Sequence, residues 1–276
     1  NDLRAPHMIE SRGSTEPGGL RWAWLAAACA TVAAAVFVRG LNGEFIFDDY
    51  VFLRFGCWQI ERAGDLLSVP FDGACRYRWL RYMSLAIDHL VWERDPRGYK
   101  LTNLVLHAVS TALVWGVIWR VLGDVPPYRR VAAATLATVI WSVHPVQVDA
   151  VTYVSGRRDL LMGMFFFAAF LAAPLSLTTT RDRVRLAVAL LLWSASVGSK
   201  EMGVTLPLLA GAWHVSRSRD DWRPTRKAVG AAAASVCLVA AAAAAALANA
   251  VSTGSVHVDL MGGTLSTHVA TMPALA

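Results

Sequence analysis

Long runs of apolar residues, separated by short polar segments, dominate the sequence from residue 22 onward. The first run covers residues 22–38, and no small-residue cleavage site of the kind that ends a signal peptide follows it. Further runs cover residues 101–119, 131–143, 160–177, 186–197, 204–215 and 228–251. Such runs favour transmembrane helices, because lipid offers backbone groups no hydrogen-bonding partners. The pattern predicts an all-α fold, a polytopic transmembrane helical bundle with about seven spans.

Two of the runs and both ends of the chain depart from this simple pattern. The runs 186–197 and 204–215 are shorter than the about 20 residues that usually cross a bilayer, so we expect tilted helices, extension by flanking residues, or a hairpin that crosses only in part. Residues 1–20 are polar and predict a disordered cytoplasmic tail before a membrane domain at 21–276. Since the sequence ends within an apolar, helix-like segment, we also expect that it is truncated at the C-terminus.

Residues 40–100 form the longest polar loop of the sequence. In its second half, residues 79–92 place apolar side chains at helical spacing, at Leu80, Met83, Ile87, Leu90 and Val91. Aromatic residues near both ends of this segment suit the headgroup level of a membrane. The segment therefore predicts an amphipathic helix lying in the membrane interface.

Basic residues gather in alternate short loops, within residues 120–130, 181–185 and 217–227. The positive-inside rule places these loops and the N-terminus in the cytoplasm. The loop 40–100, the segment 144–159, the turn near 198–202 and the tail after 251 then face the non-cytoplasmic side. Arg157 and Arg158 oppose this pattern locally, but acidic residues flank them.

The composition agrees with a membrane protein and narrows the possible functions. Of the 276 residues, 55% are hydrophobic and 17% are charged, whereas about 25% charged residues is typical of soluble domains. The net charge of +6 comes from short loops rather than from a basic face with exposed aromatics, so no nucleic-acid partner is expected. The four cysteines lack the spacing of a zinc site, and no glycine-rich nucleotide-binding loop is present.

The acidic pair Asp48 and Asp49 follows three large apolar residues just after the first run. Carboxylates at a membrane interface are costly to desolvate, which favours a functional role. Such a carboxylate can act as a general base on a hydroxyl group, or the pair can bind a divalent cation, the one cofactor that the sequence suggests. The alternative is an acidic turn exposed to water. The sequence does not decide between the two residues as the base.

Two further segments combine basic residues with aromatic or acidic neighbours. Arg78 and Arg81 lie among aromatic residues, where they are either membrane anchors or a guanidinium clamp for a phosphate group. Lys200 and Glu201 occupy the turn between the two short runs. Ionisable residues this close to hydrocarbon indicate a functional site, and the alternative is a solvated turn.

A fourth motif connects two predicted spans at residues 144–159. Its polar residues are His144, Asp149, Arg157, Arg158 and Asp159. The alternative to a site is a solvated loop in which an arginine pairs with Asp159 and contributes little to stability. His107, within a span, is expected to be a packed, hydrogen-bonded residue. All four motifs fall on the predicted non-cytoplasmic side, which indicates one shared site.

The order of these motifs resembles the TMTC family, membrane O-mannosyltransferases that carry tetratricopeptide repeats, and more broadly the GT-C glycosyltransferases. The resemblance rests on FIFDDY at 45–50, YRWL at 77–80, GYKLTNLVLHA at 98–108, HPVQVDA at 144–150, SGRRDLL at 155–161 and SKE at 199–201. It spans residues 39–202. Trp79 stands where the family has a proline, and no tetratricopeptide repeat is present in residues 1–276.

The resemblance implies a GT-C-like fold, a polyprenyl- or dolichyl-phosphate sugar donor, mannose as the sugar, and an acceptor protein or glycan on the external or luminal side. Asp48 or Asp49 then takes the proton of an acceptor hydroxyl, a protein Ser or Thr, as it attacks the anomeric carbon. The leaving lipid phosphate is stabilised by Arg78, Arg81, Arg157, Arg158 and Lys200, with His144, Asp149, Asp159 and Glu201 in support.

Other interpretations remain open at this point. Ionisable residues in membrane segments also mark the pathways of transporters and lipid flippases, although no internal repeat supports that reading. A third possibility is a non-enzymatic membrane anchor for a C-terminal repeat domain. In an oxidising compartment, Cys57 and Cys75 would be expected to form a disulfide within the external loop.

Overall fold

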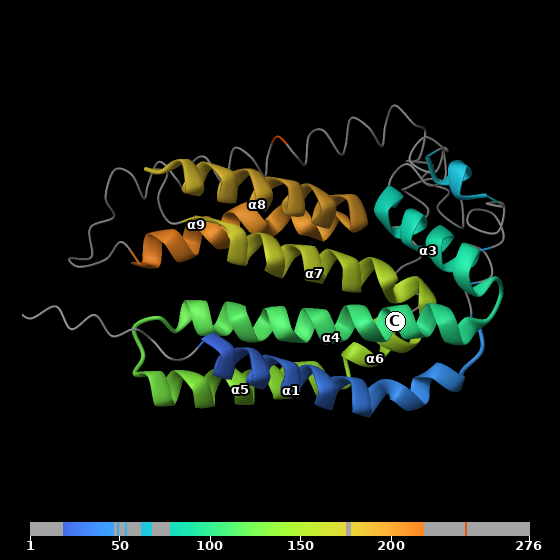
Figure 1. The fold of residues 1–276 in the computed structure, drawn as a ribbon, viewed down its shortest axis with the longest axis horizontal. Coiled ribbons are helices and arrows are strands. Elements are labelled where there is room, and N and C mark those ends of the chain that lie inside the picture. The colour runs from blue at the N-terminus through green and yellow to red at the C-terminus, as the bar shows by residue number, and fades with distance from the viewer. Residues whose placement is uncertain are drawn as a thin grey trace, which may run out of the picture.

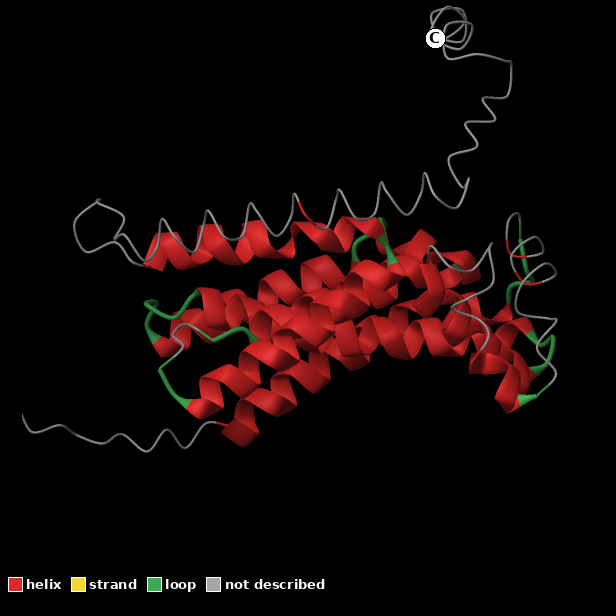
Figure 2. Cartoon of the chain, turned by 90° about the horizontal axis from the view of Figure 1, so that it is seen from above, coloured by secondary structure: helices red, strands yellow, loops and turns green. Residues whose placement is uncertain are grey.

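The computed structural model describes residues 19–46, 49, 53, 62–67, 78–174, 178–217 and 241. Within these ranges the chain is helical and has no strand (Figure 2), which confirms the predicted all-α fold. The elements are α1 (Gly19–Phe37), η1 (Val38–Asn42), η3 (Ala63–Leu67), α3 (Trp79–Trp92), α4 (Pro96–Val121), α5 (Pro127–Val143), α6 (Gln147–Thr152), η6 (Val154–Gly156), α7 (Arg157–Ala172), α8 (Thr180–Ser199), η7 (Glu201–Thr205) and α9 (Leu206–Arg217), where η denotes a 3-10 helix.

The long helices run side by side along the long axis of the molecule, and α3 lies across one end of them (Figure 1). Helix α4 is central, because it packs against α1, α5 and α7 and also contacts α3 and α6. Successive long helices run in opposite directions. The segments η1, α6, η6 and η7 therefore join helices at the end where α3 lies, which we call the α3 end. The α4–α5 and α7–α8 connections lie at the opposite end, which we call the basic end.

Polar capping residues extend two helices beyond their apolar runs. Helix α4 starts at Pro96, and the side chain of Asp95 accepts a hydrogen bond from the backbone N–H of Arg97. Helix α8 starts at Thr180, six residues before the run at 186–197, because Thr179 and Asp182 form a capping box. The resulting helix of 20 residues agrees with extension by flanking residues. The predicted span at 228–251 lies outside the described residues, apart from residue 241.

The bundle exposes apolar side chains and buries charged ones. Trp24, Leu136 and Leu191 are 69%, 64% and 71% exposed, whereas Arg81 and Arg157 are 1% and 0% exposed. Water would penalise this arrangement, while lipid tails solvate the apolar outer surface. The 20 residues Ala23–Asn42 and the 26 residues of α4 are each long and apolar enough to cross a bilayer. These features indicate a membrane protein, although the predicted number of about seven spans is not confirmed.

The predicted amphipathic helix is confirmed as α3, with the predicted bounds. Its apolar residues Ile87 and Val91 are 47% and 63% exposed, and Trp92 is also exposed. The opposite face is buried against α4 and α8 and carries Arg81 and Asp88. Helix α3 thus directs Arg81 and Asp88 into the protein, beside the buried residues Tyr82 and Leu85, and leaves Ile87 and Val91 exposed.

Candidate active site

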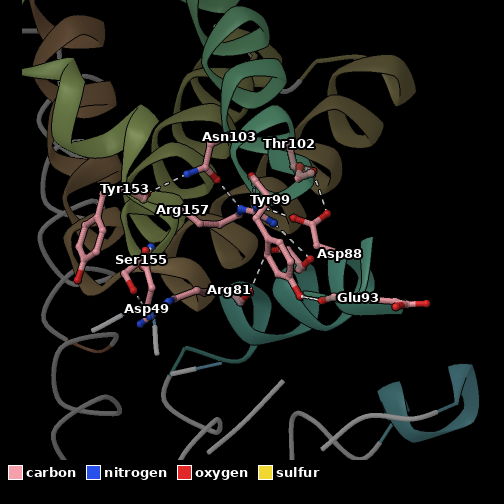
Figure 3. Close-up of polar contacts among 12 residues, drawn as sticks. Asp49, Arg81, Asp88, Glu93, Tyr99, Thr102, Asn103, Tyr153, Ser155 and Arg157 are labelled. Atoms are coloured by element: carbon pink, nitrogen blue, oxygen red, sulfur yellow. Dashed lines mark hydrogen bonds and ion pairs between the residues drawn. The ribbon is translucent and has the colours of Figure 1, made fainter. Parts of the chain in front are cut away.

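Segments that lie far apart in the sequence meet at the α3 end of the bundle. The main link is Ser155 of η6, whose backbone N–H donates to Oδ1 of Asp49 over 2.8 Å. The hydroxyl group of Ser155 accepts a longer hydrogen bond, 3.4 Å, from Nη2 of Arg81 on α3 (Figure 3). Three of the four sequence motifs are therefore joined at one residue that the sequence did not single out.

The carboxylate of Asp49 is fully buried, with 0% exposure. Besides the bond to Ser155, its Oδ2 accepts a hydrogen bond of 3.2 Å from the backbone N–H of Ile46. Lys100 of α4 interacts electrostatically with Asp49 and donates to the backbone carbonyl of Glu44 over 3.0 Å. Asp49 therefore ties the chain that follows the first helix to η6 and to the start of α4.

Arg157, the first residue of α7, is the centre of a buried polar network (Figure 3). Its Nε donates to Oδ1 of Asn103 over 2.6 Å, and its Nη2 donates to the carbonyl of Tyr99 over 2.7 Å. Its Nη1 donates to the carbonyl of Ser84 over 3.3 Å, and its Nη2 forms an ion pair of 2.6 Å with Oδ2 of Asp88. The guanidinium group thus joins α3, α4 and α7.

Asp88 is the acidic partner in this network. Burial raises the pKa of its carboxyl group, and the opposing effects of the Arg157 charge and of a 2.8 Å hydrogen bond from Thr102 do not fully compensate. A buried carboxylate depends on such partners, because its charge has lost the surrounding water. The sequence analysis missed Asp88, Thr102 and Asn103. Asp88 could have been found from the sequence, because it is an acidic residue away from the apolar face of the predicted amphipathic helix.

A second group of charges at the α3 end is partly exposed. Nη2 of Arg78 lies 3.1 and 3.0 Å from the two carboxylate oxygens of Glu201. Lys200 forms an ion pair with Oδ1 of Asp159, and Nε of Arg158 lies 3.4 Å from Oδ2 of the same carboxylate. We call these five residues the ion-pair cluster. It joins the residue that precedes α3, the start of α7, and the junction between α8 and η7.

The carboxyl group of Glu201 shows how the ion-pair cluster affects a titratable residue. Burial alone would raise its pKa. A backbone N–H hydrogen bond and the positive charges of Arg78 and Lys200 outweigh that effect, so the pKa of Glu201 lies below its ordinary value. Glu201 is therefore ionised at neutral pH and neutralises its cationic neighbours.

Close packing of α3 against α8 positions Arg78. A Cβ atom added at Gly198 would lie 2.8 Å from Nε1 of Trp79, so no larger residue fits without displacing the indole ring. Gly156 is similarly constrained, because a Cβ atom there would lie 2.6 Å from the carbonyl oxygen of Asp149. Both glycines allow segments to approach more closely than a side chain would permit.

The structure does not bring every predicted residue into these networks. His144 and Asp149 are exposed, and the ring of His144 accepts a hydrogen bond from the backbone N–H of Val146. His107 is a packed residue, as predicted, since it is fully buried and its Nε2 lies 2.9 Å from the carbonyl oxygen of Ser142. Asp48, Cys57 and Cys75 lie outside the described residues, so the proposed disulfide stays a prediction. Within the described ranges, no group of three or more acidic, His or Cys residues could hold a metal ion.

Comparison with known proteins gives an independent view of the chain. No protein-family model and no solved structure matches it. Among curated proteins it is 30% identical to human "Protein O-mannosyl-transferase TMTC3" over 132 residues, which are 47% of this chain and 14% of the relative. It is 31% identical to human "Protein O-mannosyl-transferase TMTC4" over 166 residues, 54% of this chain and 22% of the relative.

A longer match extends over more of the chain. The protein is 27% identical to Drosophila melanogaster "Protein O-mannosyl-transferase Tmtc1" over 218 residues, which are 75% of this chain and 24% of the relative. In each case the matched region is less than a quarter of the relative's length. Over that region the chain is similar to the TMTC protein O-mannosyl-transferases, and the resemblance seen in its motifs is confirmed.

Proposed function

We propose that this chain carries the active site of a membrane glycosyltransferase, which moves mannose from a polyprenyl- or dolichyl-phosphate carrier to a protein Ser or Thr hydroxyl group. The similar proteins are named protein O-mannosyl-transferases, which supports this reaction class. The observation that carries the proposal is the convergence of Asp49, Arg81 and Ser155 with the ion-pair cluster at one end of the bundle. A carboxylate can accept the proton of the acceptor hydroxyl group, and nearby cations can stabilise a phosphate leaving group.

The reaction is a single displacement. The acceptor hydroxyl oxygen forms a bond to the anomeric carbon of the sugar while the bond from that carbon to the phosphate oxygen breaks. A carboxylate takes the hydroxyl proton, and the leaving lipid phosphate keeps the bonding electron pair. Negative charge therefore grows on the phosphate in the transition state, where fixed positive charges stabilise it most effectively.

The two members of the acidic pair have different roles in this proposal. Asp49 is fully buried, and both of its oxygens already accept backbone hydrogen bonds. It therefore positions the loop and helps hold Ser155. This leaves Asp48, the adjacent carboxylate, as the general base that contacts the acceptor.

The cations also divide into two groups. Arg157 is buried, and protein acceptors surround its guanidinium group, so its role is to position α3 against the bundle. Arg81 is likewise buried and acts through Ser155. Arg78, Arg158 and Lys200 keep part of their side chains accessible. These three are the proposed phosphate ligands.

A multi-pass topology with a cytoplasmic N-terminus fits the charge distribution between the two ends. At the basic end, Arg120 donates to the carbonyl oxygens of Phe170 and Leu171 at the end of α7, and Arg130 donates to that of Trp119. Arginines that cap helix ends while their side chains lie against aromatic rings are expected near a membrane interface. Together with the positive-inside rule, these contacts support a non-cytoplasmic location of the α3 end.

A transfer assay in proteoliposomes tests the proposed function. The full chain is reconstituted with a polyprenyl-phosphate mannose and a Ser/Thr-containing peptide, and mass spectrometry detects the peptide. We expect a mass increase of one hexose with the lipid-linked sugar and none with a water-soluble nucleotide sugar. Movement of the labelled lipid between leaflets without glycosylated peptide would instead identify a transporter, and would refute the proposed transfer.

A further inference from the structure

The ion-pair cluster differs from the buried network around Arg157 in a way that bears on ligand binding. Arg157 uses all three guanidinium nitrogens on protein acceptors and is 0% exposed. In the Arg78–Glu201 pair, one nitrogen of Arg78 contacts both carboxylate oxygens, and the two side chains are 21% and 43% exposed. Strong arginine–carboxylate pairs use two parallel N–H···O bonds from two nitrogens. The Arg78–Glu201 pair is therefore suited to exchange its anion.

The second pair of the cluster has the same character. The Lys200 and Asp159 side chains are 22% and 35% exposed. Since Lys200 and Glu201 are adjacent in the chain, and Asp159 follows Arg158, the cations and carboxylates alternate across a small area. Partly exposed pairs of this kind contribute little to stability, because water competes for both charges. Their charges are therefore available for a role other than stabilising the fold.

We propose that the carboxylates of Glu201 and Asp159 compete with the phosphate group of the lipid carrier for Arg78 and Lys200. The inference rests on the proposed function and adds a binding mechanism to it. Each carboxylate neutralises a cation while no ligand is present, and it competes with the phosphate when the carrier binds. Glu201 and Asp159 are thus positioning residues that lower the affinity for the phosphate.

The substrate and the product of the transfer differ in the negative charge of their phosphate groups, and this difference explains how the competition would assist product release. The cluster holds three cations and two carboxylates, and a lipid-phosphate sugar is a diester with one negative charge. The lipid phosphate released by the transfer is a monoester with a charge of about −1.5 to −2. The product would therefore bind the cations more tightly than the substrate does. The carboxylates of Glu201 and Asp159 compete with the product phosphate for the cations, which weakens product binding and allows the product to dissociate.

Binding of the product separates this inference from the transfer reaction itself. The full chain is placed in phosphatidylcholine nanodiscs, and the dissociation constant of a radiolabelled polyprenyl monophosphate is measured. Glu201→Gln keeps the shape of the side chain and removes its charge, so we expect about two- to five-fold tighter binding, the range of an exposed ion pair. Arg78→Gln should weaken binding. Glu44→Gln, an exposed carboxylate outside the cluster, is the matched control and should change binding less than about two-fold.

Several results would overturn the inference. Weaker or unchanged binding in Glu201→Gln would show that this carboxylate supports Arg78 instead of competing with phosphate. Asp159→Asn provides an independent variant with the same expected tightening, and it serves in place of Glu201→Gln if that protein fails to fold. Equal affinity for inorganic phosphate would argue against a lipid carrier as the ligand of this cluster.

The outcomes also distinguish this inference from the proposed function. Tighter binding in Glu201→Gln without any sugar transfer by the unaltered protein would support the competition and contradict the transferase. Sugar transfer by the unaltered protein with no tightening in either carboxylate variant would leave the transferase intact and refute the competition.

Discussion

Replacing Arg157 by methionine would leave the Asp88 carboxylate in a buried site without its cation. In the intact protein the ion pair is 2.6 Å long, and the two side chains are 0% and 7% exposed. Removing one partner of such a pair costs about 3–5 kcal/mol, because the remaining charge stays desolvated. The lost hydrogen bonds to Asn103 and to the carbonyl of Tyr99 act in the same direction. We therefore expect the Arg157→Met protein to lose about 3–5 kcal/mol of unfolding free energy.

The free energy of unfolding can be measured by titration with SDS in mixed micelles. Asp88→Asn removes the stranded charge, so the double variant should be less destabilised than the sum of the two single variants. A coupling of about 2 kcal/mol is expected between the two positions. A loss below about 1 kcal/mol in Arg157→Met, or strictly additive effects, would refute the conclusion that this ion pair holds α3 to the bundle.

The stability of the Arg157→Met protein should also depend on pH. Burial raises the pKa of Asp88, and the charge of Arg157 is the main effect that opposes this. Without that charge the pKa rises further, so the folded state binds more protons than the unfolded state between the two pKa values. Stability therefore falls as pH rises through the folded pKa. The deficit should be larger at about pH 8 than at about pH 4, and Asp88→Asn should abolish the difference.

Two other substitutions test the packing of α3. Thr102→Val removes the 2.8 Å hydrogen bond to Asp88 and should lower the unfolding free energy by about 1.5–3 kcal/mol. Thr102→Ser keeps a hydroxyl group and should retain most of the stability that this bond contributes. Equal losses in the two variants would contradict the role of the hydroxyl group. Gly198→Ala should displace Trp79, since its Cβ would lie 2.8 Å from the indole nitrogen, and thereby raise the KM for the lipid donor by moving Arg78. An unchanged KM would show that this contact does not set the position of Arg78.

The helices of the bundle could largely be predicted from the sequence. A long apolar run in lipid must form its backbone hydrogen bonds within the run itself, and a helix is the local structure that does so. Helix α3 is the clearest example, since the apolar spacing of residues 79–92 predicted its bounds. Of the five apolar residues at that spacing, Ile87 and Val91 are exposed, whereas Leu80, Met83 and Leu90 are partly buried. The starts of α4 and α8 were placed too late, because their first turns are polar and are stabilised by Asp95 and by the Thr179–Asp182 capping box. A search for apolar residues alone passes over such turns.

The partners within the site could not be predicted, because they depend on how the helices pack. The sequence offered Asp159 as a partner for Arg157, but the buried guanidinium group pairs with Asp88, 69 residues earlier. Two of its other acceptors are backbone carbonyls, which every residue possesses and no motif marks. Ser155 is likewise important through its backbone N–H and its position in η6. Such roles become visible only when the segments have been placed in space.

The acidic pair gives the most direct test that these converging segments form a glycosyltransferase site. Sugar transfer from a polyprenyl-phosphate mannose is measured in proteoliposomes for the unaltered protein, Asp48→Asn and Asp49→Asn. We expect Asp48→Asn to lower kcat by about 10²–10⁴-fold, the usual contribution of a general base. Asp49→Asn should lower the stability of the protein as well, because it loses buried hydrogen bonds. An Asp48→Asn protein that transfers the sugar at the unaltered rate would contradict the account.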